Sequence, residues 1–79
     1  MWKVWREDNN YIQGELVSKH SSKSAALKKA ADEIEYKHTV KEEDTNEIVI
    51  WLEDEDRKPI GIITKNKGAK RLRQGKKKK

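Results

Sequence analysis

The sequence predicts an α+β fold, a small antiparallel sheet with one helix packed on one face in the order ββαββ, followed by a disordered C-terminal tail. Four short segments are rich in Val, Ile and aromatic residues and are bounded by polar turns, which is typical of strands. One alanine-rich segment repeats apolar residues at i, i+3, i+4 and i+7, which is typical of a helix. We expect a domain over residues 1–64 and a basic tail over residues 65–79.

The first two strands form the predicted N-terminal hairpin. Residues 2–6 are rich in β-preferring side chains, and the polar residues 7–10 suit a turn. The second strand is predicted over residues 11–17. Within it, Gly14 indicates a bulge or a close approach of the helix.

The helix is predicted over residues 23–36. Ser21 or Ser22 can cap it by accepting a hydrogen bond from a free backbone N–H of the first turn. Its predicted apolar stripe consists of Leu27, Ala30, Ala31 and Ile34. Because alanine is small, this helix can lie close to the sheet.

The last two strands are predicted over residues 48–52 and 59–64. The first is an apolar run typical of an interior strand, and its alternation places Trp51 on the face opposite Ile50. The second can begin with Pro59 because the first residue of a strand need not donate a ladder hydrogen bond. Two hairpins on either side of one helix imply a mainly antiparallel sheet.

Residues 37–46 give a weaker signal than the segments around them. A short strand at Thr39 and Val40 is one alternative, but the polar residues that follow suit a loop. We expect most of this stretch to be irregular.

Composition limits the classes of protein to which the chain can belong. Its 79 residues allow one domain with a modest core, and the absence of cysteine excludes disulfides and thiolate chemistry. No segment has the roughly 20 apolar residues that a bilayer-spanning helix needs. We expect a cytoplasmic protein with no membrane partner.

Charge is divided unevenly along the chain, which has 19 basic and 14 acidic residues. The tail holds nine basic residues and no acidic one, so residues 1–64 keep 19 minus 9, or 10, basic groups against 14 acidic ones, a net charge of −4. Polyanion affinity comes from local clusters of Lys and Arg, which makes the tail the predicted nucleic-acid contact. Its basic residues are Lys65, Lys67, Lys70, Arg71, Arg73, Lys76, Lys77, Lys78 and Lys79.

Tryptophans are the other candidate binding residues. If Trp5 and Trp51 share the face away from the helix, their rings can stack on nucleic-acid bases. The alternative is that they cover a thin core or form a dimer contact, since the chain has no phenylalanine.

No sequence motif indicates catalysis, a cofactor or a metal site. His20 and His38 lie on opposite sides of the predicted helix without ligand spacing, and the acidic runs 42–44 and 53–56 lack the glycine and alternating ligands of a calcium loop. We expect these acidic runs to be solvated turns, and we expect no enzyme activity.

The sequence resembles two groups of small proteins. One is a small uncharacterised bacterial ββαββ domain family that opens with Trp-x-Val, has a lysine and alanines on a helix and ends on a Glu-apolar-Val-Ile strand. The matching residues are Trp2, Val4, Lys23, Ala25, Glu47, Val49 and Ile50. More weakly, the chain resembles the monomeric chromosomal proteins of methanogens, which implies DNA binding and bending. The matching residues are Arg6, Glu7, Asp8, Ala25, Ala26, Leu27 and Lys28.

The predicted function is that of a non-enzymatic accessory protein, a monomer or weak homodimer, that binds DNA or RNA through phosphate contacts of the tail. One alternative is a module that binds a protein through the Trp51 face while the tail holds an acidic surface, either on that partner or at residues 42–44 and 53–56. Another is a small cellular-defence or mobile-element modulator. The tail itself could also be a solubilising or added lysine extension.

Overall fold

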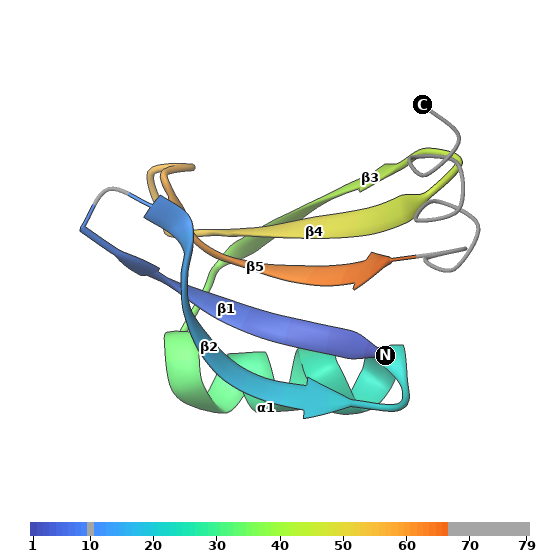
Figure 1. Cartoon of the computed structure of the whole chain (residues 1–79). Helices are drawn as coiled ribbons and strands as arrows, with labels where there is room; N and C mark the ends of the chain where they lie inside the picture. The colour runs from blue at the N-terminus through green and yellow to red at the C-terminus, as the bar shows by residue number, and fades with distance from the viewer. Residues whose placement is uncertain (10, 67–79) are drawn as a thin grey trace.

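The computed structural model describes residues 1–9 and 11–66, which form one helix and five strands (Figure 1). In chain order the elements are β1 (Trp2–Asp8), β2 (Tyr11–His20), α1 (Lys23–Ile34), β3 (His38–Glu43), β4 (Glu47–Glu53) and β5 (Pro59–Asn66). All neighbouring strands pair antiparallel in the order β2-β1-β5-β4-β3. The predicted α+β class, with one helix on an antiparallel sheet, is confirmed. Within the described residues, no helix is long and apolar enough to cross a membrane.

The predicted ββαββ order is wrong in one respect, because β3 is a further strand and the order is ββαβββ. Five of the six β3 residues are exposed, so this strand lacks the apolar alternation that marks the others. It forms as an edge strand by pairing with β4, from His38 opposite Glu53 to Glu43 opposite Ile48. Asp44 closes the hairpin turn. Its Oδ1 accepts hydrogen bonds from the backbone N–H of Asn46, just before β4, and from that of Glu47, the first residue of β4.

The middle of the sheet is β5, which pairs with β1 on one side and β4 on the other. Its residues Gly61, Ile62 and Ile63 are all buried. β5 continues to Asn66, so Lys65, which was predicted to begin the tail, lies within this strand. The rest of the predicted tail lies outside the described residues.

The helix α1 lies across β2 and β1 and also contacts β5, whereas β3 and β4 extend past it (Figure 1). Ser22 caps the helix as predicted, its Oγ accepting a hydrogen bond from the backbone N–H of Ala25 at 3.2 Å. The helix ends at Ile34, two residues earlier than predicted, where Glu35 adopts a left-handed conformation with φ 58°. Ala26 and Ala30 are fully buried, which lets the helix lie close to the sheet.

The apolar stripe of the helix differs by one residue from the predicted one. Ala31 is exposed, whereas Ala26 packs in the core together with the partly buried Leu27 and Ile34. Helix and sheet approach closely at Gly61, where an added Cβ would lie 2.9 Å from the Cδ1 of Ile34. The C-terminal end of the stripe therefore reaches the middle strand.

The predicted irregularity near Gly14 is present, but its cause is β1 rather than the helix. The β1–β2 register shifts between Arg6 and Asp8, opposite the β2 segment that holds Gly14. An added Cβ at Gly14 would lie 2.6 Å from the Cβ of Asp8. This close approach leaves no room for a side chain there.

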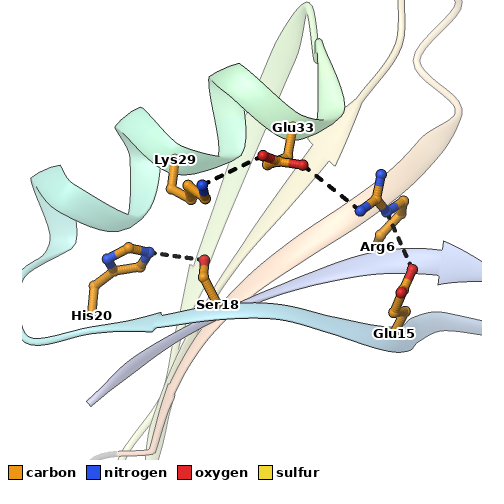
Figure 2. A network of polar contacts seen from close by, with 6 residues as sticks. All are labelled: Arg6, Glu15, Ser18, His20, Lys29 and Glu33. Atoms are coloured by element: carbon orange, nitrogen blue, oxygen red, sulfur yellow. Dashed lines mark hydrogen bonds and ion pairs between the residues drawn. The ribbon is translucent and has the colours of Figure 1, made fainter.

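Ion pairs tie the helix to the hairpin (Figure 2). The Arg6 guanidinium on β1 lies between Glu15 of β2, at 3.4 Å from Nε to Oε1, and Glu33 of α1, at 3.9 Å from Nη2 to Oε1. Lys29 extends the chain of contacts by pairing with Glu33 at 3.4 Å from Nζ to Oε2. All four side chains are partly exposed, so this network contributes little to stability and mainly orients the helix on the hairpin.

Candidate functional site

The sheet has one face covered by α1 and one face that α1 does not cover, which we call the open face. Val4 of β1 packs in the core with Ala26 and Ala30, so the next residue, Trp5, points to the open face. Directly paired residues of antiparallel strands share a face. Trp5 is paired with Ile62, and Ile62 is paired with Trp51. Both tryptophans therefore lie on the open face, which is the condition that sequence analysis set for a stacking surface.

One apolar row crosses the open face and takes one residue from each of the five strands. Following the pairing from β2 to β3, the row consists of Leu16, Trp5, Ile62, Trp51 and Val40. Ile62 in the middle is only 5% exposed, and the two tryptophans beside it are half-buried. The edge residues Leu16 and Val40 are exposed. The rings thus cover the centre of the sheet and still reach the surface.

A second row, which we call the polar row, runs beside the apolar row on the same face. From β2 to β3 it consists of Lys19, Lys3, Thr64, Val49 and Glu42. Its two ends differ in charge, because two lysines occupy β2 and β1 and one glutamate occupies β3. The open face is consequently cationic at one side and anionic at the other.

Both indoles donate their N–H to the polar row. Trp5 Nε1 donates to Thr64 Oγ1 at 3.0 Å, and Trp51 Nε1 donates to Glu42 Oε1 at 3.0 Å. Each bond crosses to the next strand in the same direction, from β1 to β5 and from β4 to β3. The two rings therefore lean the same way across the sheet. They are two strand spacings apart, about 10 Å.

The two lysines of the polar row do not favour the pairing of the strands that carry them. Lys3 and Lys19 are directly opposite each other, and both are exposed. Like charges at opposed positions of a sheet destabilise it. In the part of the chain that the structure describes, neither lysine forms an ion pair that would offset this repulsion. Two adjacent exposed cations raise the local concentration of anions.

The one described basic residue of the predicted tail is on the other face. Lys65 is paired with the buried Trp2, and its Nζ lies 5.1 Å from the centroid of the Trp2 ring. The eight remaining basic residues of the tail, Lys67 to Lys79, lie outside the described residues. β5 ends beside the start of β1, at the end of the sheet that carries Lys3 and Lys19. On its other side the end of β5 is paired with the start of β4, where Glu47 lies opposite Asn66.

The histidines and acidic runs have structural partners. His20 Nε2 lies 2.8 Å from Ser18 Oγ beneath α1 (Figure 2), and His38 begins the edge strand β3. In the last turn, Asp54 Oδ1 accepts N–H bonds from Asp56 and Lys58. Among residues 1–9 and 11–66, no three or more His, Cys, Asp or Glu side chains gather as a metal site.

Sequence reasoning found both tryptophans of the site but missed the residues that surround them. Val40 and Glu42 were missed because the stretch holding them was expected to be irregular. Lys3 and Lys19 were missed because their pairing depends on the strand register, which includes a shift between Val4 and Trp5. A signal was present for Lys3, which alternates with Trp2 and Val4 in the predicted first strand. Lys19 lies beyond the strand predicted over residues 11–17, so no such signal marked it.

A comparison of the chain with protein-family models, curated proteins and solved structures gives no match. The two family resemblances noted in the sequence therefore stay predictions.

Proposed function

We propose that the protein binds single-stranded nucleic acid, with bases stacked on the open face and phosphates held by lysines and by the basic tail. The observation that carries the proposal is the alignment of Trp5 and Trp51 in one row, each with its N–H bonded within the sheet. The protein acts in this proposal as a binding accessory without enzyme activity.

The two indoles suit stacking because their polar atoms are already satisfied. An indole whose N–H is bonded to a neighbouring side chain leaves its π face for contact with a ligand. Base stacking on an aromatic side chain contributes about 1–3 kcal/mol per base and tolerates any sequence. Only unpaired bases can reach a ring that leans across a sheet, so single strands fit better than a duplex.

Charge on the same face supports a phosphate backbone over β1 and β2. Lys3 and Lys19 are adjacent and exposed there, and the tail with its cluster of basic residues follows from the end of β5 nearby. A body with a net charge of −4 would otherwise repel nucleic acid. Local clusters of cations overcome that repulsion by releasing counterions from the ligand.

A protein partner on the open face is the second candidate function. Leu16 and Val40 at the ends of the apolar row are 41% and 38% exposed. Aliphatic side chains add little to base stacking but contribute to an apolar protein interface. This observation makes a protein partner the alternative if nucleic acid does not bind.

The decisive experiment is a fluorescence-anisotropy titration with single-stranded and duplex oligonucleotides of equal length. We expect tighter binding to the single strand, and a loss of roughly 5- to 150-fold for Trp51→Leu, the equivalent of one stacked base. Tyr11→Leu is the matched control, because Tyr11 is 72% exposed and lies outside the apolar row. A chain ending at Asn66 keeps β5 complete and should bind more weakly and with less salt dependence.

Two results would contradict the proposal. If the intact chain binds neither ligand at low salt, the protein-partner candidate replaces it. If Tyr11→Leu weakens binding as much as Trp51→Leu, the open face is not the stacking surface. Thermal melting of each variant shows whether the fold is kept.

A further inference from the structure

We infer that Glu42 makes the Trp51 position selective for guanine, so that the open face reads one base while it stacks on others. This inference rests on the proposed single-strand binding. It begins from the bond between Trp51 Nε1 and Glu42 Oε1 at 3.0 Å, which holds a carboxylate at the edge of the indole. A base stacked on that ring has an edge next to the carboxylate.

Glu42 retains acceptor capacity after it has bonded the indole. An ionised carboxylate has two oxygens with about four acceptor sites, and the Trp51 N–H uses one of them. The Glu42 side chain is exposed, and it forms no ion pair with any residue that the structure describes. Its remaining acceptor sites can therefore receive donors from a ligand.

The donors of guanine match a carboxylate best. Guanine presents N1–H and the N2 amino group side by side, so that two parallel hydrogen bonds can form with the two oxygens. Cytosine and adenine present one amino group beside an acceptor nitrogen. Uracil and thymine present one N–H between two carbonyl oxygens, which a carboxylate repels. The expected order is guanine, then cytosine and adenine, then uracil and thymine.

The distribution of charge on the open face allows a carboxylate in a protein surface that binds nucleic acid. Within the polar row, Glu42 and Lys3 are separated by three strand spacings, or roughly 14 Å. That separation exceeds the Debye length of about 8 Å at physiological salt. Phosphates can follow the lysine side while a base edge points to β3. The polar row thus orients the bound strand across the sheet.

A purely structural role for Glu42 would be to hold the Trp51 ring in place. Glu42→Gln separates the two roles, because the glutamine amide oxygen can still accept the indole N–H. The same change replaces one acceptor oxygen by an NH2 donor and removes the charge. If Glu42 only orients the ring, base preference stays as it is in the original protein.

The test uses the full chain and short thymidine oligonucleotides that carry a single guanine, adenine or cytosine, with all-thymidine as the reference. We expect the guanine oligonucleotide to bind roughly 5- to 100-fold tighter than the reference, the discrimination of one good bidentate contact. Glu42→Gln should reduce that ratio to within about 2-fold. Glu47→Gln is the matched control, because Glu47 is exposed, begins the adjacent strand β4 and bonds no indole.

The outcomes separate this inference from the function on which it rests. Binding to none of the oligonucleotides overturns both. Tight binding to all four alike leaves single-strand binding intact and overturns the selectivity of Glu42. A loss of guanine preference in Glu47→Gln equal to that in Glu42→Gln shows a general charge effect and also overturns it. The comparison of the four oligonucleotides with the unchanged protein does not depend on the folding of any variant.

Discussion

The two faces of the sheet use tryptophan in opposite ways. On the covered face, Trp2 is 6% exposed and packs in the core with Val4 and Ile63. On the open face, Trp5 and Trp51 are half-buried and donate their N–H groups to neighbouring strands. The cause is that α1 packs on one face only, where it contacts β1, β2 and β5, and no helix of the described residues covers the face that carries Trp5 and Trp51 (Figure 1).

The comparison shows how a short chain can cover both faces of a sheet when it has a single helix. The single helix packs on one face, so on the open face Ile62 is covered by neighbouring side chains of the sheet itself. Large aromatic rings do this while keeping part of their surface available. Packing alone does not explain why Lys3 stands opposite Lys19 beside those rings. The proposed binding of nucleic acid gives that pair a role.

The largest expected effect is on the free energy of unfolding, and it should differ between the tryptophans of the two faces. Trp2→Ala should reduce the free energy of unfolding by about 3–5 kcal/mol, since it removes a buried ring. Trp51→Ala should cost roughly half as much, because its ring already has contact with solvent and its transfer term is smaller. Urea unfolding followed by far-UV circular dichroism measures both.

Equal losses of unfolding free energy in Trp2→Ala and Trp51→Ala would contradict the difference between the two faces. The open face would then be a second core, and the Trp51 ring would belong to packing rather than to a ligand surface. Tyr11→Ala is the control for removal of an exposed ring and should change the unfolding free energy by less than about 0.5 kcal/mol.

A smaller effect is expected at Gly61, which lies on the covered face opposite Leu52. An added Cβ would lie 2.7 Å from the Trp5 carbonyl oxygen and 2.9 Å from Ile34 Cδ1. Gly61→Ala should therefore cost about 1–3 kcal/mol by overpacking. Ile34→Val removes the nearer helix atom, so the double variant should be less destabilised than the sum of the two single ones. Strict additivity in urea unfolding would show that Ile34 is not the obstacle.

Strands with apolar alternation and the capped helix could be predicted from the sequence, because their local signals agree with the fold. β3 could not, since an exposed edge strand of charged residues carries the composition of a loop and forms through its pairing with β4. The central place of β5 rests on its long-range contact with β1, for which no local signal exists. For the site, Trp5 and Trp51 followed from residue type. Their partners Thr64 and Glu42 required the register.

The smallest expected effect concerns the lysine pair, and here stability and binding should change in opposite directions. Lys3→Thr removes the repulsion of Lys19 and introduces a β-branched residue, so unfolding free energy should rise by a few tenths of a kcal/mol. The same change should weaken single-strand binding and reduce the slope of log affinity against log salt by about 0.7. Lys58→Thr, in the turn at the opposite end of the sheet, is the control and should change neither. If Lys3→Thr lowers stability and leaves the salt slope unchanged, Lys3 serves packing, and the cationic side of the open face loses its role.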